Sequence, residues 1–378
     1  MTHRRDFLKG AAAGGVIFCG CGVDAAQAQQ DAKQLSYRHP DSGKKHKPVM
    51  LNGKRAKVVD VHSHCFFKDA IDLMGPGFKT NAAVKGTPEH YIAVSNADNL
   101  KVRLDAMDAM GVDMEVLSIN PFWYGADRDR AAAVVKTNNM HLAELCAAHP
   151  KRFSAFCGLA LQHPDLAVEQ LTAAMKMPGI RGIGVGGSVL QTDFSEAKFH
   201  PIWAKAEELG AVLFIHPQST PQLSARFKGN GWLANTIGNP LDTTIALQKL
   251  IFEGTLDKFP GLKLIAAHGG GYFGSYAPRS DHACFVSPAN CNPDIVLKKK
   301  PTEYLNQMYF DALVFTPEAL RHLVAQVGAS QVVVGTDHPI PWEDYPIEHV
   351  MATVTLTPAQ KAGILGGNAA KLLKITEI

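Results

Sequence analysis

The chain has 378 residues, of which 46% are hydrophobic and 19% are charged, a composition typical of globular enzymes. Its 38 lysine and arginine residues nearly cancel its 35 aspartate and glutamate residues, which leaves a formal net charge of +3. So small a charge, without a basic stripe, argues against nucleic acid or an anionic membrane surface as a partner. A small carboxylic acid remains compatible, because one or two well-placed arginines suffice to bind it.

The first 28 residues have the pattern of an export signal. Arg4-Arg5 precedes an apolar, glycine-rich stretch from Gly10 to Gly22, and Ala26-Gln27-Ala28 offers a cleavage site of small residues. We therefore expect residues 1–28 to be a twin-arginine-type signal and the enzyme to be periplasmic. The apolar stretch is too short to span a membrane, so no membrane partner is expected for the mature form. Residues 29–56 are polar and basic, and we expect a solvated leader.

Strand and helix patterns alternate from residue 57 to residue 378. Strand-like apolar runs begin near Lys57, Val112, Phe153, Ile180, Ala211, Leu262, Met308 and Gln331. Helical patterns lie between them at Leu100–Met110, Arg128–His149, Asp165–Met177, Glu196–Leu209, Leu241–Phe259, Pro317–Val327 and Pro358–Leu373. The connection after His268 is irregular, and we expect a long loop with a short helix. This alternation predicts an α/β fold, a (β/α)8 barrel of the TIM type, with a doubly wound sheet as the alternative.

Five cysteines remain after the signal, namely Cys65, Cys146, Cys157, Cys284 and Cys291. An odd number without regular spacing does not indicate a disulfide framework. Cys284 and Cys291 flank a short loop and could pair in an oxidising periplasm. We expect buried or free thiols instead.

Histidine and aspartate recur at the expected C-terminal ends of strands. His62 and His64 lie at the end of the first strand, where the period of two places both imidazoles on one side. His216 ends the fifth strand and Asp337 ends the eighth. Each alone has an ordinary structural explanation, but the carboxyl ends of barrel strands meet at one face. There the four residues predict a site for one divalent metal ion, Zn²⁺ with Mn²⁺ as the alternative.

Other residues near these strand ends are expected to support the metal. His268 ends the sixth strand before three glycines, and we expect it beside the metal, where it moves a proton. Asp60 precedes His62 by two residues and could orient a ligand. The fourth strand ends in Gly186-Gly187-Ser188 without a lysine to bridge a second metal, which favours a single ion.

With these motifs, the sequence resembles the amidohydrolase superfamily. The similar branch is that of 2-amino-3-carboxymuconate-6-semialdehyde decarboxylase and related aromatic-acid decarboxylases, and the resemblance runs from about Val58 to Leu373. Beyond the metal motifs it rests on Val102–Asp108, Val116–Ser118, Pro150–Phe153, Asp165–Val168, Phe259–Lys263 and Asp311–Val314.

The resemblance implies the same four metal ligands, with Asp337 also among the catalytic residues and His268 as the acid/base. It further implies that Arg103 and Arg279 bind the substrate carboxylate. Arg279, expected in a loop, would reach the site of a neighbouring subunit in a homodimer. The implied activity is metal-dependent, non-oxidative decarboxylation of an aromatic or unsaturated carboxylic acid.

Two alternatives remain open from the sequence. The same ligands would serve a hydrolase or hydratase that acts on a lactone, amide or alkene, and a non-catalytic periplasmic metal- or ligand-binding protein is the other possibility. Gln218 stands where the muconate-semialdehyde enzymes carry a tryptophan, and Pro121–Tyr124 also departs from their pattern. The substrate of those enzymes is therefore not transferred.

Overall fold

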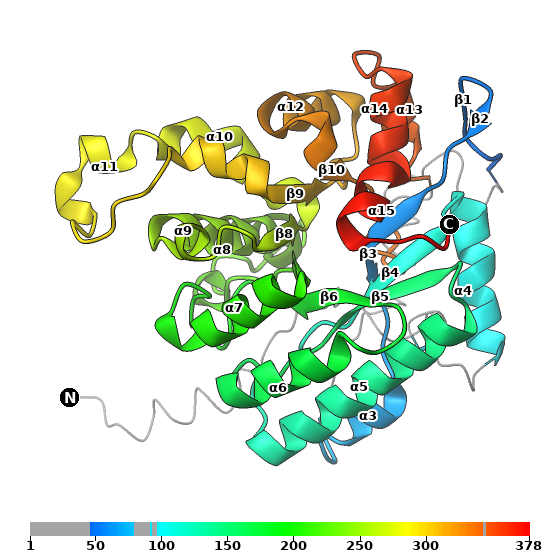
Figure 1. The fold of residues 1–378 in the computed structure, drawn as a ribbon, viewed down its shortest axis with the longest axis horizontal. Coiled ribbons are helices and arrows are strands. Elements are labelled where there is room, and N and C mark those ends of the chain that lie inside the picture. The colour runs from blue at the N-terminus through cyan, green and yellow to red at the C-terminus, as the bar shows by residue number, and fades with distance from the viewer. Residues whose placement is uncertain (1–45, 79–90, 93–96, 343–344) are drawn as a thin grey trace.

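The computed structural model describes residues 46–78, 91–92, 97–342 and 345–378, and in these ranges the chain forms a parallel barrel (Figure 1). The expected signal lies outside the described residues, as does most of the expected leader. Eight parallel strands neighbour one another in chain order: β3 (Val59–His64), β4 (Met114–Ser118), β5 (Phe153–Cys157), β6 (Ile180–Val185), β7 (Val212–Ile215), β8 (Lys263–Ala266), β9 (Met308–Asp311) and β10 (Val332–Val333). Nearly every strand residue is buried, as in sheets covered on both faces.

The barrel closes between its first and last strands. Asp60 pairs with Val334 and Ser63 pairs with His338, both in parallel orientation. Three backbone hydrogen bonds complete the closure, from Val61 N to Val334 O (2.9 Å), from Asp337 N to His62 O (2.7 Å) and from His64 N to His338 O (2.7 Å). The expected (β/α)8 barrel is therefore confirmed, and the doubly wound sheet is excluded.

Helices connect the strands and surround the barrel. The α-helices are α3 (Lys68–Asp72), α4 (Ala97–Met110), α5 (Arg128–Ala148), α6 (Pro164–Ala174), α7 (His200–Leu209), α8 (Asn239–Phe252), α9 (Thr255–Lys258), α10 (Phe273–Ser280), α11 (Ala283–Val286), α12 (Pro317–Val327), α13 (Glu348–Ala352), α14 (Pro358–Ala362) and α15 (Asn368–Leu373). Short 3-10 turns lie at Ala197–Phe199, Pro221–Leu223, His268–Gly270, Pro288–Asn290, Pro301–Gln307 and Ala329–Gln331, and π-helical turns at Ala234–Gly238 and Gly363–Gly367.

Two apolar clusters hold the barrel and its helices together. The larger one fills the layer between strands and helices and includes Trp203 of α7 and Leu250 of α8. The smaller one gathers alternate strand residues such as Val61 and Phe214 with Leu373 of α15. The period of two along a strand thus sends one set of side chains outward and the other inward.

Three expected helices are divided or begin differently from the sequence-based prediction, whereas α4, α5 and α6 differ from it only by one to three residues at their ends. The expected helix 241–259 divides into α8 and α9, because Gly254 adopts a left-handed conformation (φ 68°) between them. The helix expected from Glu196 begins as a 3-10 turn, and α7 starts at His200 with a proline in its first turn. A π-helical turn separates α14 from α15 in the last expected helix.

The segment after β8 contains more helix than expected and forms an arm that projects from the barrel (Figure 1). Its helices are α10 and α11. A disulfide joins Cys284 of α11 to Cys291, with a Cα–Cα distance of 5.7 Å, so the expectation of unpaired thiols was wrong for this pair. The seven-residue separation lets a single helical turn and its following loop bring the two thiols together. Cys65, Cys146 and Cys157 are free and buried.

The described end of the expected leader is structured. Strands β1 (Met50–Leu51) and β2 (Lys54–Arg55) form an antiparallel hairpin, and the preceding Val49 is buried. Val49 and Leu51 pack against the core, whereas Met50, Lys54 and Arg55 are exposed, so this end of the expected leader forms a hairpin with most of its side chains in solvent. Within the described ranges, no helix has the length and apolar character needed to cross a membrane.

Candidate metal centre and active site

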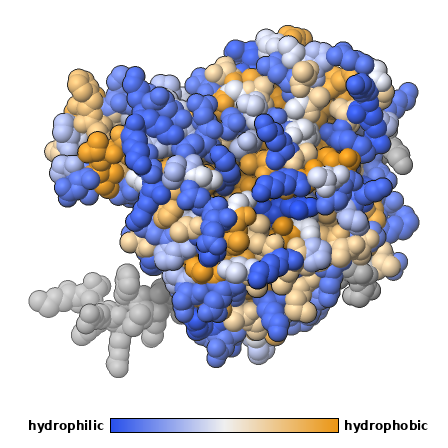
Figure 2. Space-filling model, viewed as in Figure 1, coloured by the Kyte–Doolittle hydropathy of each residue, from blue (hydrophilic) through white to orange (hydrophobic). Residues whose placement is uncertain are grey.

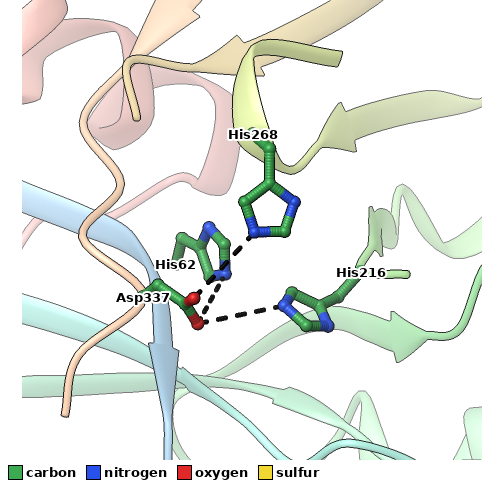
Figure 3. A group of neighbouring side chains, drawn as sticks. All are labelled: His62, His216, His268 and Asp337. Carbon is green, nitrogen blue, oxygen red and sulfur yellow. Dashed lines mark ion pairs between the residues drawn. The ribbon is translucent and has the colours of Figure 1, made fainter. Parts of the chain in front are cut away.

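Side chains from four strand ends converge on one point at the C-terminal end of the barrel. His62, His216, His268 and Asp337 each offer a ligand atom, and these atoms all lie within 4.8 Å of one another. Figure 3 shows the three imidazoles pointing toward the Asp337 carboxylate from separate elements. His64 belongs to the same assembly, since its Nε2 lies 2.8 Å from Asp337 Oδ1.

The two oxygens of Asp337 face different groups. The Nε2 atoms of His62, His64 and His216 lie 3.3, 2.8 and 3.9 Å from Oδ1. In contrast, His268 Nε2 lies 3.9 Å from Oδ2. The side chain of His268 is also more exposed, at 14%, than those of the other three histidines, at 4% or less. This arrangement favours a ligand group around Oδ1, with His268 beside it.

A buried carboxylate orients His62. Its Nδ1 lies 2.6 Å from Asp311 Oδ2, at the end of β9. Asp311 also accepts hydrogen bonds from the backbone N–H groups of His268 (2.9 Å), Gly269 (2.8 Å) and Leu313 (3.2 Å). Because every bond to this ionised carboxylate comes from a donor, His62 Nδ1 carries its proton toward Asp311. That tautomer leaves the lone pair of Nε2 for a metal ion.

Ser118 orients His64 in the same way. Its hydroxyl donates to Ser63 O at 3.1 Å and lies 3.1 Å from His64 Nδ1. The single hydroxyl proton is used on the carbonyl, so the oxygen accepts the Nδ1 proton of His64. Both His62 and His64 therefore present Nε2 to the cluster.

Burial and mutual proximity set the protonation of the cluster. Burial lowers the pKa of His64, and burial together with His64 and His62 holds the pKa of His216 well below its ordinary value. Burial raises the pKa of Asp337, but His62 and His268 outweigh it and hold this pKa well below its usual range. In His62, burial lowers the pKa, yet Asp337 and Asp311 raise it to about 10. Protons and a divalent ion therefore compete for His62 Nε2.

The donor set fits a divalent metal ion. His62 Nε2, His64 Nε2 and both ring nitrogens of His216 are buried without a hydrogen-bond partner among the described residues. Unsatisfied buried nitrogens are costly, and a cation removes that cost at the one nitrogen of each imidazole whose lone pair it binds. Three imidazoles and one carboxylate form a common ligand set for such ions.

Glycine permits the close approach that brings the barrel ends together. A Cβ at Gly335 would lie 2.8 Å from His62 Cβ and 2.7 Å from Asp311 Cβ, closer than real side chains tolerate. A Cβ at Gly271 would lie 2.0 Å from Pro240 O. The glycines around the strand-end motifs therefore serve close backbone packing.

Backbone strain gathers at the same end of the barrel. Seven non-glycine residues with left-handed φ lie in segments that follow strand C-termini: Leu190, Gln191, Ser219, Trp232, His268, Phe315 and Asp337. Such conformations cost about 1–3 kcal/mol each and persist where the surroundings enforce them, often at functional sites. Two of the seven, His268 and Asp337, belong to the group of histidine and aspartate side chains that could hold a metal ion.

Arg103 does not take the position expected of a substrate-binding residue. It is fully buried in α4, where Nε donates to Glu115 Oε2 (2.7 Å) and a terminal nitrogen donates to His64 O (2.7 Å). Glu115 Oε1 lies 2.6 Å from Nδ1 of His338. The buried carboxylate of Glu115 directs the guanidinium inward, so Arg103 supports the backbone of His64, while Glu115 holds the imidazole of His338 after β10.

Asp60 and Arg279 also differ from expectation. Asp60 bonds the backbone N–H groups of His62 (2.9 Å) and Thr336 (3.1 Å) and the Ser63 and Thr336 hydroxyls, so it fastens the ligand-bearing backbones and not an imidazole. Arg279 lies in the last turn of α10 and not in a loop, and its side chain is exposed. Its contact with a neighbouring subunit stays a prediction.

Sequence reasoning missed several supporting residues. Asp311 and Ser118 entered only as parts of the family resemblance, although both end apolar strands, the same signal that singled out the predicted metal ligands. Glu115 and Trp342 carried no signal. A carboxylate inside a strand has no distinctive spacing, and Trp342, whose indole N–H bonds Asp337 Oδ2 at 2.8 Å, lies in an irregular segment.

Comparison with known protein families agrees with this geometry. The family model described as Amidohydrolase matches residues 59–375, which span the barrel and every residue of the cluster. The chain belongs to the amidohydrolase family. It is 32% identical over 282 residues to a 2-amino-3-carboxymuconate-6-semialdehyde decarboxylase of Dictyostelium discoideum, which covers 74% of this chain and 77% of the relative. It is 29% identical over 285 residues to a gamma-resorcylate decarboxylase of Rhizobium radiobacter, covering 72% and 86%.

Several solved structures of similar fold are also named as decarboxylases. A 2,6-dihydroxybenzoate decarboxylase complexed with 2,6-dihydroxybenzoate has a TM-score of 0.72 and 25% identity, and the match covers 84% of this chain and 99% of that one. A 5-carboxyvanillate decarboxylase from Sphingomonas paucimobilis, at 22% identity and TM-score 0.74 over 85% and 100% of the two chains, shows the shared fold. The predictions of the family branch, the barrel and a metal-dependent carboxy-lyase are thereby confirmed.

Proposed function

We propose that this enzyme removes CO2 without oxidation from an aromatic carboxylic acid. The observation that carries the proposal is the arrangement of four histidines around Asp337, in which three imidazoles face Oδ1 and a fourth, more exposed one faces Oδ2. This arrangement supports a metal site with an acid/base beside it, which is the pair of groups that decarboxylation through a carbanion-like state needs. The decarboxylase names of its relatives support the same choice.

In this proposal His62, His64, His216 and Asp337 hold one divalent ion, and His268 is the acid/base. We propose Zn²⁺, since a set of imidazoles with one carboxylate is typical of zinc, while Mn²⁺ is the alternative that metal analysis would reveal. The bound ion supplies positive charge that stabilises the negative charge developing on the substrate. His268 donates a proton to the ring carbon as the bond to the carboxylate carbon breaks and leaves its electron pair on that carbon.

The substrate is proposed to be a small aromatic acid with a polar group beside its carboxylate. This follows the 2,6-dihydroxybenzoate bound in the similar solved structure. Trp232 and Trp342 stack with ring centroids 5.3 Å apart, and Trp342 contacts Asp337, so a flat apolar surface adjoins the metal cluster. Gln218, two residues after His216 in the chain, adds an amide whose Nε2 is 3.3 Å from Pro121 O.

We further propose a homodimer in which Arg279 completes the neighbouring site. The arm that carries Arg279 exposes large apolar side chains, with exposed fractions of 61% for Tyr276, 84% for Phe285 and 83% for Val296. Figure 2 shows apolar surface on this projecting arm. Contact with a second copy would bury that surface and bring an exposed guanidinium toward a substrate carboxylate. Mixing inactive His268→Ala and Arg279→Ala subunits tests this, since only a shared site restores part of the activity.

Export to the periplasm is proposed from the N-terminal pattern and is supported by the Cys284–Cys291 disulfide, because such bonds persist in oxidising compartments. Replacing Arg4 and Arg5 by lysine should leave active, unprocessed enzyme in the cytoplasm. Active enzyme recovered from the periplasm of that variant would contradict the proposed route.

The main experiment measures CO2 release from a panel of hydroxylated benzoates by the metal-loaded enzyme. His62→Ala should lose both the metal and CO2 release. His141→Ala, which changes a histidine on the outer face of α5 paired with Asp69, should keep both. Water addition or hydrolysis without CO2 would favour the hydratase or hydrolase alternative, and no turnover of any acid would favour a binding protein.

A further inference from the structure

The two oxygens of the Asp337 carboxylate differ in more than their histidine neighbours. Oδ1 faces three imidazoles, whereas Oδ2 accepts a hydrogen bond of 2.8 Å from the indole Nε1 of Trp342. A carboxylate can hold a metal ion through one oxygen or through both, and an oxygen occupied by a donor is less free to turn toward the ion. Trp342 therefore bears on how Asp337 binds.

An indole suits a donor to Asp337 Oδ2 because it has neither a charge nor a lone pair that could bind a metal ion. Its N–H is a donor only, so it cannot ligate a metal ion, accept a proton or carry charge. A lysine or histidine at this position would add a charge or a competing ligand. Trp342 thus engages Oδ2 without placing a second charge or a second ligand beside His268, whose Nε2 lies 3.9 Å from the same oxygen.

The indole is itself held from several sides. It stacks on Trp232 from the segment after β7, with centroids 5.3 Å apart and planes at 15°, and contacts Phe315 from the segment after β9 at 6.1 Å. Trp232 and Phe315 have φ values of 49° and 65°, strained for aromatic residues. Two successive turns, with Ile340 N bonded to Asp337 O (2.9 Å) and Trp342 N to Ile340 O (2.8 Å), fix Trp342 relative to Asp337.

We propose that Trp342 is a positioning residue that holds Oδ2 of Asp337, so that Oδ1 is the carboxylate oxygen that would be presented to the metal. The aromatic cluster of Trp232, Phe315 and Trp342 provides the rigidity that this role needs. The inference rests on the proposed metal site and does not depend on the identity of the substrate.

The test uses the full-length enzyme loaded with Co²⁺, whose visible absorption reports coordination. Trp342→Phe removes the N–H donor and keeps an aromatic face. Benzothienylalanine at Trp342 is a closer match, because sulfur replaces the N–H group in a ring of nearly the same shape. Both changes should shift the Co²⁺ bands and weaken metal affinity about 10-fold or more in competition with a chelator, the usual effect of removing a partner of a metal ligand.

Trp232→Phe is the matched control, since it keeps both the stack and the bond from Trp342 to Asp337. Its Co²⁺ spectrum and metal affinity should match those of the wild-type enzyme. If the benzothienylalanine enzyme is folded by circular dichroism and also matches the wild type in spectrum and affinity, the inference is overturned. A wild-type enzyme that binds no Co²⁺ would instead overturn the metal site and the proposed function.

Discussion

Replacing Asp311 by asparagine tests how strongly the carboxylate that orients His62 affects the metal affinity. All four donors around Asp311 point at it: His62 Nδ1 and the His268 amide bond Oδ2, while the Gly269 and Leu313 amides bond Oδ1. An asparagine offers one oxygen and one NH2 group. Whichever way it turns, its NH2 group meets two N–H donors, so buried donors are left without an acceptor.

The expected cost has two separate parts. Each buried donor left unsatisfied costs about 1–3 kcal/mol of folding free energy. Loss of the carboxylate behind a ligating histidine typically weakens metal binding 10- to 100-fold, or about 1.4–2.7 kcal/mol. We therefore expect Asp311→Asn to fold with reduced stability and to bind metal at least 10-fold more weakly.

Competition with a chromophoric chelator measures the metal affinity, and chemical denaturation of the metal-free protein measures the folding cost independently. Ser118→Ala provides a comparison, because it removes the neutral partner of His64 and should have the smaller effect on affinity. A folded Asp311→Asn enzyme with wild-type metal affinity would refute the argument that Asp311 fixes the tautomer of His62.

Three further predictions address other parts of the molecule. His268→Ala should keep its metal and lose kcat by about 10²–10⁴-fold, and loss of metal in elemental analysis would place His268 among the ligands instead. Burial raises the pKa of Asp242 from 3.8 to about 7, so the folded protein binds this proton more tightly than the unfolded chain does. The free energy of unfolding should therefore fall by about 1.4 kcal/mol per pH unit as the pH rises toward 7. Asp242→Asn should remove this part of the pH dependence in denaturant titrations, and an unchanged slope of the free energy of unfolding between pH 5 and 7 would contradict the prediction. The Cys284→Ser/Cys291→Ser pair should lower the free energy of unfolding by up to about 2.5 kcal/mol for so short a loop, and a larger loss would mean that the arm packs more cooperatively with the barrel than its exposure indicates.

The sequence predicted the barrel and the convergence of histidine and aspartate side chains at its strand ends because both depend on local patterns. Apolar runs at regular intervals specify parallel strands, and the period of two correctly placed His62 and His64 on one side. Contacts between distant segments were harder to predict. The guanidinium of Arg103 bonds Glu115, twelve residues away on another element, and nothing in the spacing of the two residues reveals this contact. The Cys284–Cys291 pair depends on the exact fold of the arm, and the break at Gly254 depends on a single left-handed residue.

The predicted metal ligands lie on both sides of the contact that closes the barrel, between its first and last strands. Strand β10 has only two residues, so the seam between the first and last strands is held by a few hydrogen bonds and by Asp60. His62 and His64 lie on one side of this seam and Asp337 lies on the other. A metal ion bound by these residues would link the first strand to the segment after the last one, and its binding free energy would add to the free energy needed to separate them. Removing the metal with a chelator should therefore weaken the contact between the first and last strands more than the contacts between the other strands.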